Sequence, residues 1–152
     1  MARYRITFLI SVLLLVISCA SNPPTFVETH DETGVWKAVH LHSHYGIFAN
    51  KNQEVWRRVV DILSEKYDLE VLDRTSGYIR TSWKYLLPTD SDKKYRSRII
   101  IKMLGNVWHT AKLKTEAQLW DDSHETWITG YDTAVLEEVY KDVQGRIGTS
   151  IR

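Results

Sequence analysis

The sequence predicts an α+β fold, in which an antiparallel sheet of about five or six strands carries two helices on one face. Three observations favour this class. Several segments alternate apolar and polar residues, which is the period of a half-buried strand. Two other segments space their apolar residues as one face of a helix does. The segments follow one another as strand, helix, successive strands and helix, an order typical of helices segregated to one side of an antiparallel sheet.

The first strand is predicted over 35–45, and one of its sides carries His40, His42 and His44. Side chains two apart on a strand point the same way and lie about 6.6 Å apart, so two of these histidines could share one zinc ion. A third ligand would have to come from elsewhere, and no HExxH or paired-cysteine spacing supplies one. His40 and His42 are therefore weak metal candidates, and a solvated strand face is the preferred interpretation.

Both helices are predicted from apolar stripes that follow capping residues. Asn50 and Asn52 offer caps for the first helix, of about fifteen residues. Its stripe is Val55, Trp56, Val59, Val60, Ile62 and Leu63. The second helix begins at Asp132 or Thr133. Its stripe is Val135, Leu136, Val139, Tyr140 and Val143.

Between the helices the chain predicts strands joined by short turns. Gly77 supplies one turn, where a positive φ is allowed, and Gly105-Asn106 supplies another. The strands are predicted over 69–73, 78–87, 95–104, 107–120 and, briefly, 127–129.

The first 18 residues predict a secretion signal. Arg3 and Arg5 precede an apolar run over 6–17, and a basic start before a short apolar stretch is typical of such leaders. The run is too short to cross a bilayer, which takes about 20 residues. We expect residues 1–18 to be removed.

Cys19 is the single cysteine of the chain, and it ends the segment Val16-Ile17-Ser18-Cys19. That segment resembles a lipobox, the site where lipoprotein precursors are cleaved and the cysteine acylated; an ordinary signal peptide with an incidental cysteine is the alternative. Acyl chains anchor a soluble domain at a membrane surface. By resemblance to sorting rules, Ala20 fits transport to the outer membrane, on its periplasmic face or at the cell surface. We expect a flexible tether over 19–33 and one domain over 34–152.

Charge and motifs exclude several functional classes. The chain after the leader has 18 basic and 19 acidic residues, a balance that does not favour nucleic acid as a partner. The sequence has no Gly-x-Ser-x-Gly elbow and no phosphate-binding glycine loop. The acidic pairs Asp121-Asp122 and Glu137-Glu138 are typical of solvated positions. We therefore expect no catalytic residue, no enzymatic activity and no cofactor, and the oligomeric state stays open.

A basic and aromatic face is predicted on one side of the sheet, because adjacent strands paired as hairpins would bring their outward positions together. Such a face could hold an anionic partner, namely lipid headgroups, a glycan or an acidic protein patch. Alternating Lys and Arg on an open sheet also serve solubility alone. The residues of this face are Tyr78, Arg80, Lys84, Arg96, Arg98, Lys102, Trp108, Lys112, Lys114 and Trp120.

Two segments, Glu54–Leu63 and Leu69–Trp83, carry a resemblance to a known family. A Val-Trp helix, a strand, the turn Asp73-Arg74-Thr75-Ser76-Gly77 and a strand ending near a Trp resemble the opening of BamC/NlpB-type lipoprotein domains. The resemblance implies a helix-grip fold, with a long helix across a curved antiparallel sheet, and an outer-membrane location. Those proteins also have a long extended segment that docks on a partner and two such domains, whereas this chain offers a short segment and one domain.

The sequence thus favours a lipid-anchored, non-catalytic interaction or accessory module of the bacterial envelope, with an envelope protein as partner and a role in outer-membrane assembly implied by the resemblance. One alternative is a lipid- or glycan-binding lipoprotein that uses the groove between helix and sheet. Another is a surface lipoprotein that binds metal through His40 and His42.

Overall fold

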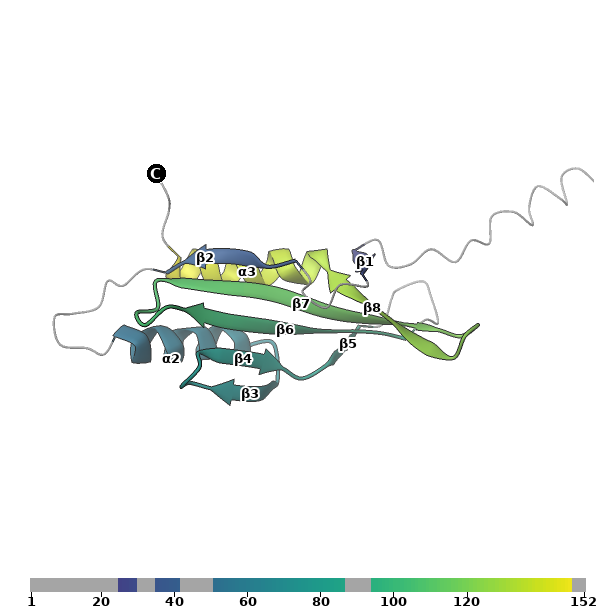
Figure 1. The fold of residues 1–152 in the computed structure, drawn as a ribbon, viewed down its shortest axis with the longest axis horizontal. Coiled ribbons are helices and arrows are strands. Elements are labelled where there is room, and N and C mark those ends of the chain that lie inside the picture. Colours follow the sequence, from purple (N-terminus) through teal and green to yellow (C-terminus); the bar gives the residue numbers. More distant parts are fainter. Residues whose placement is uncertain (1–24, 30–34, 42–50, 87–93, 149–152) are drawn as a thin grey trace, which may run out of the picture.

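The computed structural model describes residues 25–29, 35–41, 51–86 and 94–148 (Figure 1). These residues form one eight-stranded sheet with two helices on one of its faces, so the predicted α+β class is confirmed. The elements in chain order are β1 (Phe26–Glu28), β2 (Lys37–His40), α2 (Lys51–Ser64), β3 (Leu69–Asp73), β4 (Tyr78–Thr81), β5 (Lys84–Leu86), β6 (Tyr95–Leu104), β7 (Thr110–Asp121), β8 (Thr126–Asp132) and α3 (Thr133–Ile147).

The long strands β6 and β7 form the centre of the sheet. They pair antiparallel from Tyr95↔Leu119 to Leu104↔Thr110. Strands β2 and β8 share the other edge of β7, while β4 and β5 share the other edge of β6. The six-strand path β1-β8-β7-β6-β4-β3 has the predicted number of strands, and the short strands β2 and β5 add two beside it.

The main core lies between the helices and the sheet. Alternate residues of the central strands, such as Ile101 and Leu113, meet the apolar stripes of α2 and α3, represented by Val59 and Val143. All four side chains are essentially excluded from solvent. Burying one such side chain stabilises the fold by about 1.5–3 kcal/mol. One alternative from the sequence was a ligand-binding groove between the helices and the sheet. Apolar core side chains fill that space.

The two helices are also joined at their solvent edge by ion pairs. Lys66, just after α2, contacts Glu138 at 2.8 Å and Asp142 at 2.7 Å on α3. Arg146 donates two hydrogen bonds to the carboxylate of Glu65. Such exposed pairs contribute little individually, so the apolar contacts hold the helices in place. In the described part of the chain, neither helix has the length and apolar content needed to cross a membrane.

The predicted cap residues have different roles in the structure. Asp132 is the N-cap of α3, and its side chain accepts hydrogen bonds from the amides of Ala134 and Val135. Asn52 lies inside α2, so its prediction as a cap is wrong. Its side-chain amide donates to the carbonyl of Asn106 and accepts from the amide of Trp108, which fixes the β6–β7 turn to the helix. Asn50 lies outside the described residues.

The predicted flexible tether over 19–33 is wrong for Phe26–Glu28, which form strand β1 at the edge of the sheet. Phe26 is buried, and its ring packs edge-on against Tyr95 with 5.9 Å between centroids. Burial of this apolar ring stabilises the pairing of the short segment with β8. The predicted strand over 35–45 is described only as far as β2 and the isolated bridge of Leu41 to Gly148.

A buried polar cluster ties β6, β7, β8 and α3 together around Asp132. Tyr95 donates its hydroxyl proton to Asp132 Oδ2 at 2.6 Å. Thr115 bonds both the amide and the carbonyl of Asp132 through its hydroxyl. Burial and then the neighbouring carboxylate raise the pKa of the Tyr95 phenol, so Tyr95 stays a neutral donor. Every buried oxygen of this cluster therefore has a partner, as low-dielectric surroundings require.

We predict that Tyr95→Phe lowers the free energy of unfolding by about 1.5–3 kcal/mol, because a buried carboxylate loses a hydrogen bond while the ring stays. Urea denaturation measures the change. Tyr140→Phe is the matched control, because the hydroxyl of Tyr140 has no hydrogen bond to the described residues. Equal stability losses in the two variants would show that the Tyr95 hydroxyl has no special role.

Candidate interaction surface

The face of the sheet opposite the helices is called the open face here. It is formed by the side chains that register places beside one another away from the core. Arg96 lies opposite Gln118, Arg98 opposite Glu116, Ile100 opposite Lys114, and Lys102 opposite Lys112. Arg80 of β4 lies opposite Ile100 on the same side. The structure thus brings eight of the ten predicted residues to one face, namely Tyr78, Arg80, Arg96, Arg98, Lys102, Lys112, Lys114 and Trp120.

Lys84 lies on the other side, so its predicted position is wrong. The strand predicted over 78–87 is interrupted at Ser82 and Trp83, and the alternation changes phase there. Lys84 consequently pairs with the buried Ser97 and lies over the ring of Tyr67 on the helix side, 4.8 Å from its centroid. The same phase change moves Trp83 and Tyr85 to the open face, where the alternation did not place them.

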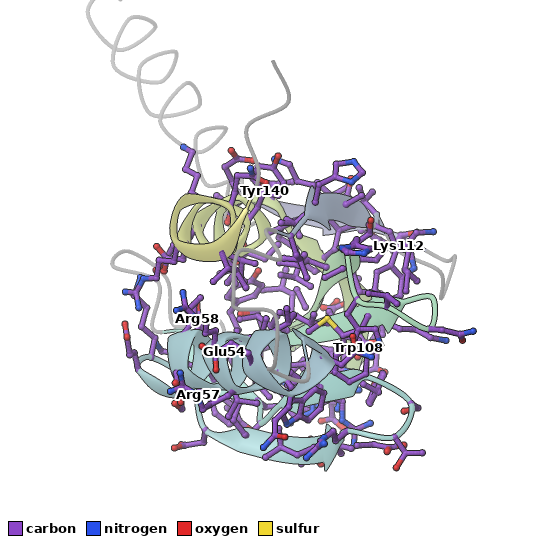
Figure 2. The ribbon with its side chains drawn as sticks, turned by 90° about the vertical axis from the view of Figure 1, so that its left-hand side faces the viewer. Glu54, Arg57, Arg58, Trp108, Lys112 and Tyr140 are labelled. Carbon is purple, nitrogen blue, oxygen red and sulfur yellow. The ribbon has the colours of Figure 1, made fainter. Side chains whose placement is uncertain are left out.

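Trp108 is also wrongly predicted, because it lies in the turn before β7 and not on the strand. Its side chain is buried in the main core and contacts Trp56 of α2, with 5.8 Å between ring centroids. Figure 2 shows Trp108 beside α2, while Lys112 lies on the far side of the molecule from Arg57 and Arg58.

Arg96 is held in an aromatic clamp toward the end of the open face that carries Trp127. Its guanidinium lies 4.2 Å from the ring centroid of Trp127 and 4.7 Å from that of Trp83. It donates from Nε and Nη2 to Gln118 Oε1, and from Nη1 to the hydroxyl of Tyr85. These partners are neutral, so they fix the group without cancelling its charge. A guanidinium has five N–H donors, so Arg96 retains donors for a further anion.

Two carboxylates neutralise the neighbouring cations. Glu116 lies between Arg98, at 2.6 Å, and Lys114, at 2.9 Å. Glu70 contacts Arg80 at 3.2 Å. Burial alone would raise the pKa of the Glu116 carboxyl, but the hydrogen bonds from Lys114 and Arg98 outweigh it, so its pKa lies below the usual 4.5. This part of the face is an internally paired network.

The two ends of the open face have different chemistry. At one end, Lys102 and Lys112 are exposed and directly opposite each other, and neither has an ion pair or hydrogen bond within the described residues. At the other end, the rings of Trp120 and Trp127 contact each other at 5.3 Å, and Lys94 lies over Trp120. Three carboxylates lie on the strands of this face, namely Glu70, Asp73 and Glu116. The Arg and Lys side chains of the face outnumber them, so the face has a net positive charge.

Sequence reasoning missed Trp83, Tyr85, Gln118 and Trp127 as members of the surface. The β7–β8 hairpin could have indicated Trp127, because it pairs directly with Trp120. The interruption at Ser82 and Trp83 could not be predicted, because apolar and polar residues continue to alternate through this segment of the sequence.

The other candidates do not assemble a chemical site among the described residues. His40 is exposed, and its Nδ1 lies 3.3 Å from the hydroxyl of Thr110, while His42 falls outside the described residues. No cluster of three or more His, Cys, Asp or Glu side chains able to hold a metal occurs in the described segments. The β7–β8 turn holds Asp121, Ser123 and His124, but both partners contact the same ring nitrogen, Nδ1. A Ser-His-Asp triad requires them on opposite nitrogens.

We predict that Glu116→Gln destabilises the fold at pH 7, because Arg98 and Lys114 lose the carboxylate between them. The lowered pKa means that this stabilisation is fully present above pH 4.5 and disappears as the pH falls through the lower value in the folded protein. Urea denaturation at several pH values should show the gap between wild type and variant closing below pH 4.5. Asp122→Asn, in the exposed turn, is the control. A gap that stays constant into the acid range would contradict the assignment.

No family model matches this chain, and no curated protein matches it. The resemblance to BamC/NlpB-type domains therefore stays a prediction.

Proposed function

We propose that this protein is a lipid-anchored, non-catalytic interaction module of the bacterial envelope, and that the open face is its binding surface. The observation that carries the proposal is a sheet face that neither helix covers, on which Trp83, Trp127 and Tyr85 surround Arg96. Trp, Tyr and Arg are the residue types enriched at the energetic centres of interfaces. Their mutual contacts hold them in one geometry before any partner binds, which lowers the entropy cost of binding.

The anchor supports the envelope location. A lipid-bearing Cys19 would hold the domain at a membrane, and Ala20 after it favours the outer membrane, on its periplasmic face or at the cell surface. An accessory role in outer-membrane assembly rests on the resemblance to BamC/NlpB-type domains alone. In that role the protein partner would belong to the assembly machinery.

The open face is favoured over the other binding sites by what surrounds each of them. Core side chains such as Leu63 and Ile79 fill the space between the helices and the sheet, so a lipid or glycan would have to displace them to bind in a groove there. The Nδ1 of His40 lies beside the hydroxyl of Thr110, and within the described segments no group of three or more His, Cys, Asp or Glu side chains could hold a metal ion.

The proposal predicts cross-linking from the open face in the native envelope. Tyr85 is 60% exposed, and replacing it with the photoreactive amino acid p-benzoylphenylalanine places a probe at the edge of the aromatic clamp. We expect several-fold more adducts, to protein or to lipid, from position 85 than from position 141 on α3, where the side chain of Lys141 is 72% exposed.

The mass of the same purified protein tests the anchor, because it should correspond to acylated Cys19 as the first residue. Equal adduct yields from the two positions would contradict the role of the face, and an unmodified thiol would contradict the anchor.

A further inference from the structure

We propose that the open face lies on the anionic phospholipid headgroups of the bilayer that carries the anchor. This inference rests on the proposed function and names what the face binds. A lipid surface is favoured by the length of the tether and by the charge and aromatic content of the face.

The tether is short because β1 belongs to the sheet. Only residues 20–25 separate Cys19 from Phe26. At about 3.3–3.6 Å per residue, even a fully extended chain reaches only about 25 Å. β1 pairs with β8, whose Trp127 lies on the open face. The strand that follows the tether and the strand that carries Trp127 are therefore neighbours, as Figure 1 shows for β1 and β8.

A short tether keeps headgroups at high local concentration near the open face. The second contact becomes an intramolecular step, so modest attraction is enough to hold the face on the surface. A lipid chain combined with a basic patch is a recognised two-part mode of membrane attachment.

The chemistry of the open face suits headgroup phosphates. Lys102 and Lys112 are exposed and lack partners within the described residues, and Arg96 keeps its charge because its partners are neutral. The Trp120–Trp127 pair adds amphipathic rings of the kind enriched at membrane–water interfaces. Basic side chains gain free energy near an anionic lipid surface and lose it as salt screens them.

This orientation leaves the helices facing away from the membrane. The solvent side of α2, with Arg57 and Arg58, lies across the molecule from Lys112 (Figure 2). The sheet then serves as the membrane contact.

The test uses residues 19–152 with Cys19→Ser, a chain that contains every residue the structure describes and carries no acyl group. Its binding to vesicles of phosphatidylglycerol and phosphatidylethanolamine is compared with binding to pure phosphatidylcholine by co-sedimentation. We expect preference for the anionic vesicles, and the preference should fall as salt is added. Lys102→Gln/Lys112→Gln should bind the anionic vesicles about 30-fold more weakly, and Lys112→Gln alone about fivefold more weakly.

The matched control is Arg57→Gln/Lys141→Gln, which removes the same charge from the helical side and should change binding less than twofold. Thermal unfolding of each variant verifies that it is folded. Substituting Lys102 and Lys112 should not destabilise the sheet, because like charges directly opposite each other do not stabilise it. Equal binding to anionic and neutral vesicles would overturn the proposal, as would equal losses in the two double variants. Because this chain has no lipid, its result is independent of whether Cys19 is acylated in the cell.

Discussion

The structure depends on the register in which β6 pairs with β7. This register puts apolar residues on one face of the sheet and charged residues on the other. Ile101 and Leu113 are opposite each other on the inner side, and Arg98 and Glu116 are opposite each other on the outer side. A slip of one residue would exchange the two sets. Two helices cover the inner side, so the same register that builds the core puts the charged residues on the face that neither helix covers.

The open face is stabilised by its own side chains. Stacking of Arg96 and Arg98 on Trp83 covers a large ring without burying an isolated charge. Glu116 and Glu70 balance part of the remaining charge, and Lys102 and Lys112 are left exposed at one end. The cluster around Asp132 has a different role, because it fixes the start of α3 to the strands that carry the open face. Rigid support below an exposed charged surface is what an interaction module requires.

Much of the fold could be predicted from the sequence because the long elements have strong periodicity. The stripes of α2 and α3 and the alternation of β6 indicated both helices and the face that carries Arg96 and Arg98. The errors at Trp83, Trp108 and Phe26 arise where a local rule competes with packing. An interruption of two residues reverses the alternation without changing the composition of the segment. The turn residue Trp108 packs into the core beside Gly77, whose lack of a side chain leaves room for the ring. The buried ring of Phe26 brings a short strand to the sheet from a polar segment.

Together the described features give a domain with an apolar side covered by helices and a basic, aromatic side that neither helix covers, and in the proposed arrangement the anchor holds the second side close to the bilayer. The most direct test of that arrangement is chemical acetylation of the lysines of the wild-type protein. Mass spectrometry compares the extent of acetylation in native membranes with that after detergent extraction. Lys102 and Lys112 should react several-fold more slowly in membranes than in detergent, while Lys141 on α3 should react equally in both. If Lys102 and Lys112 react at the same rate in membranes and detergent, the open face does not rest on the bilayer.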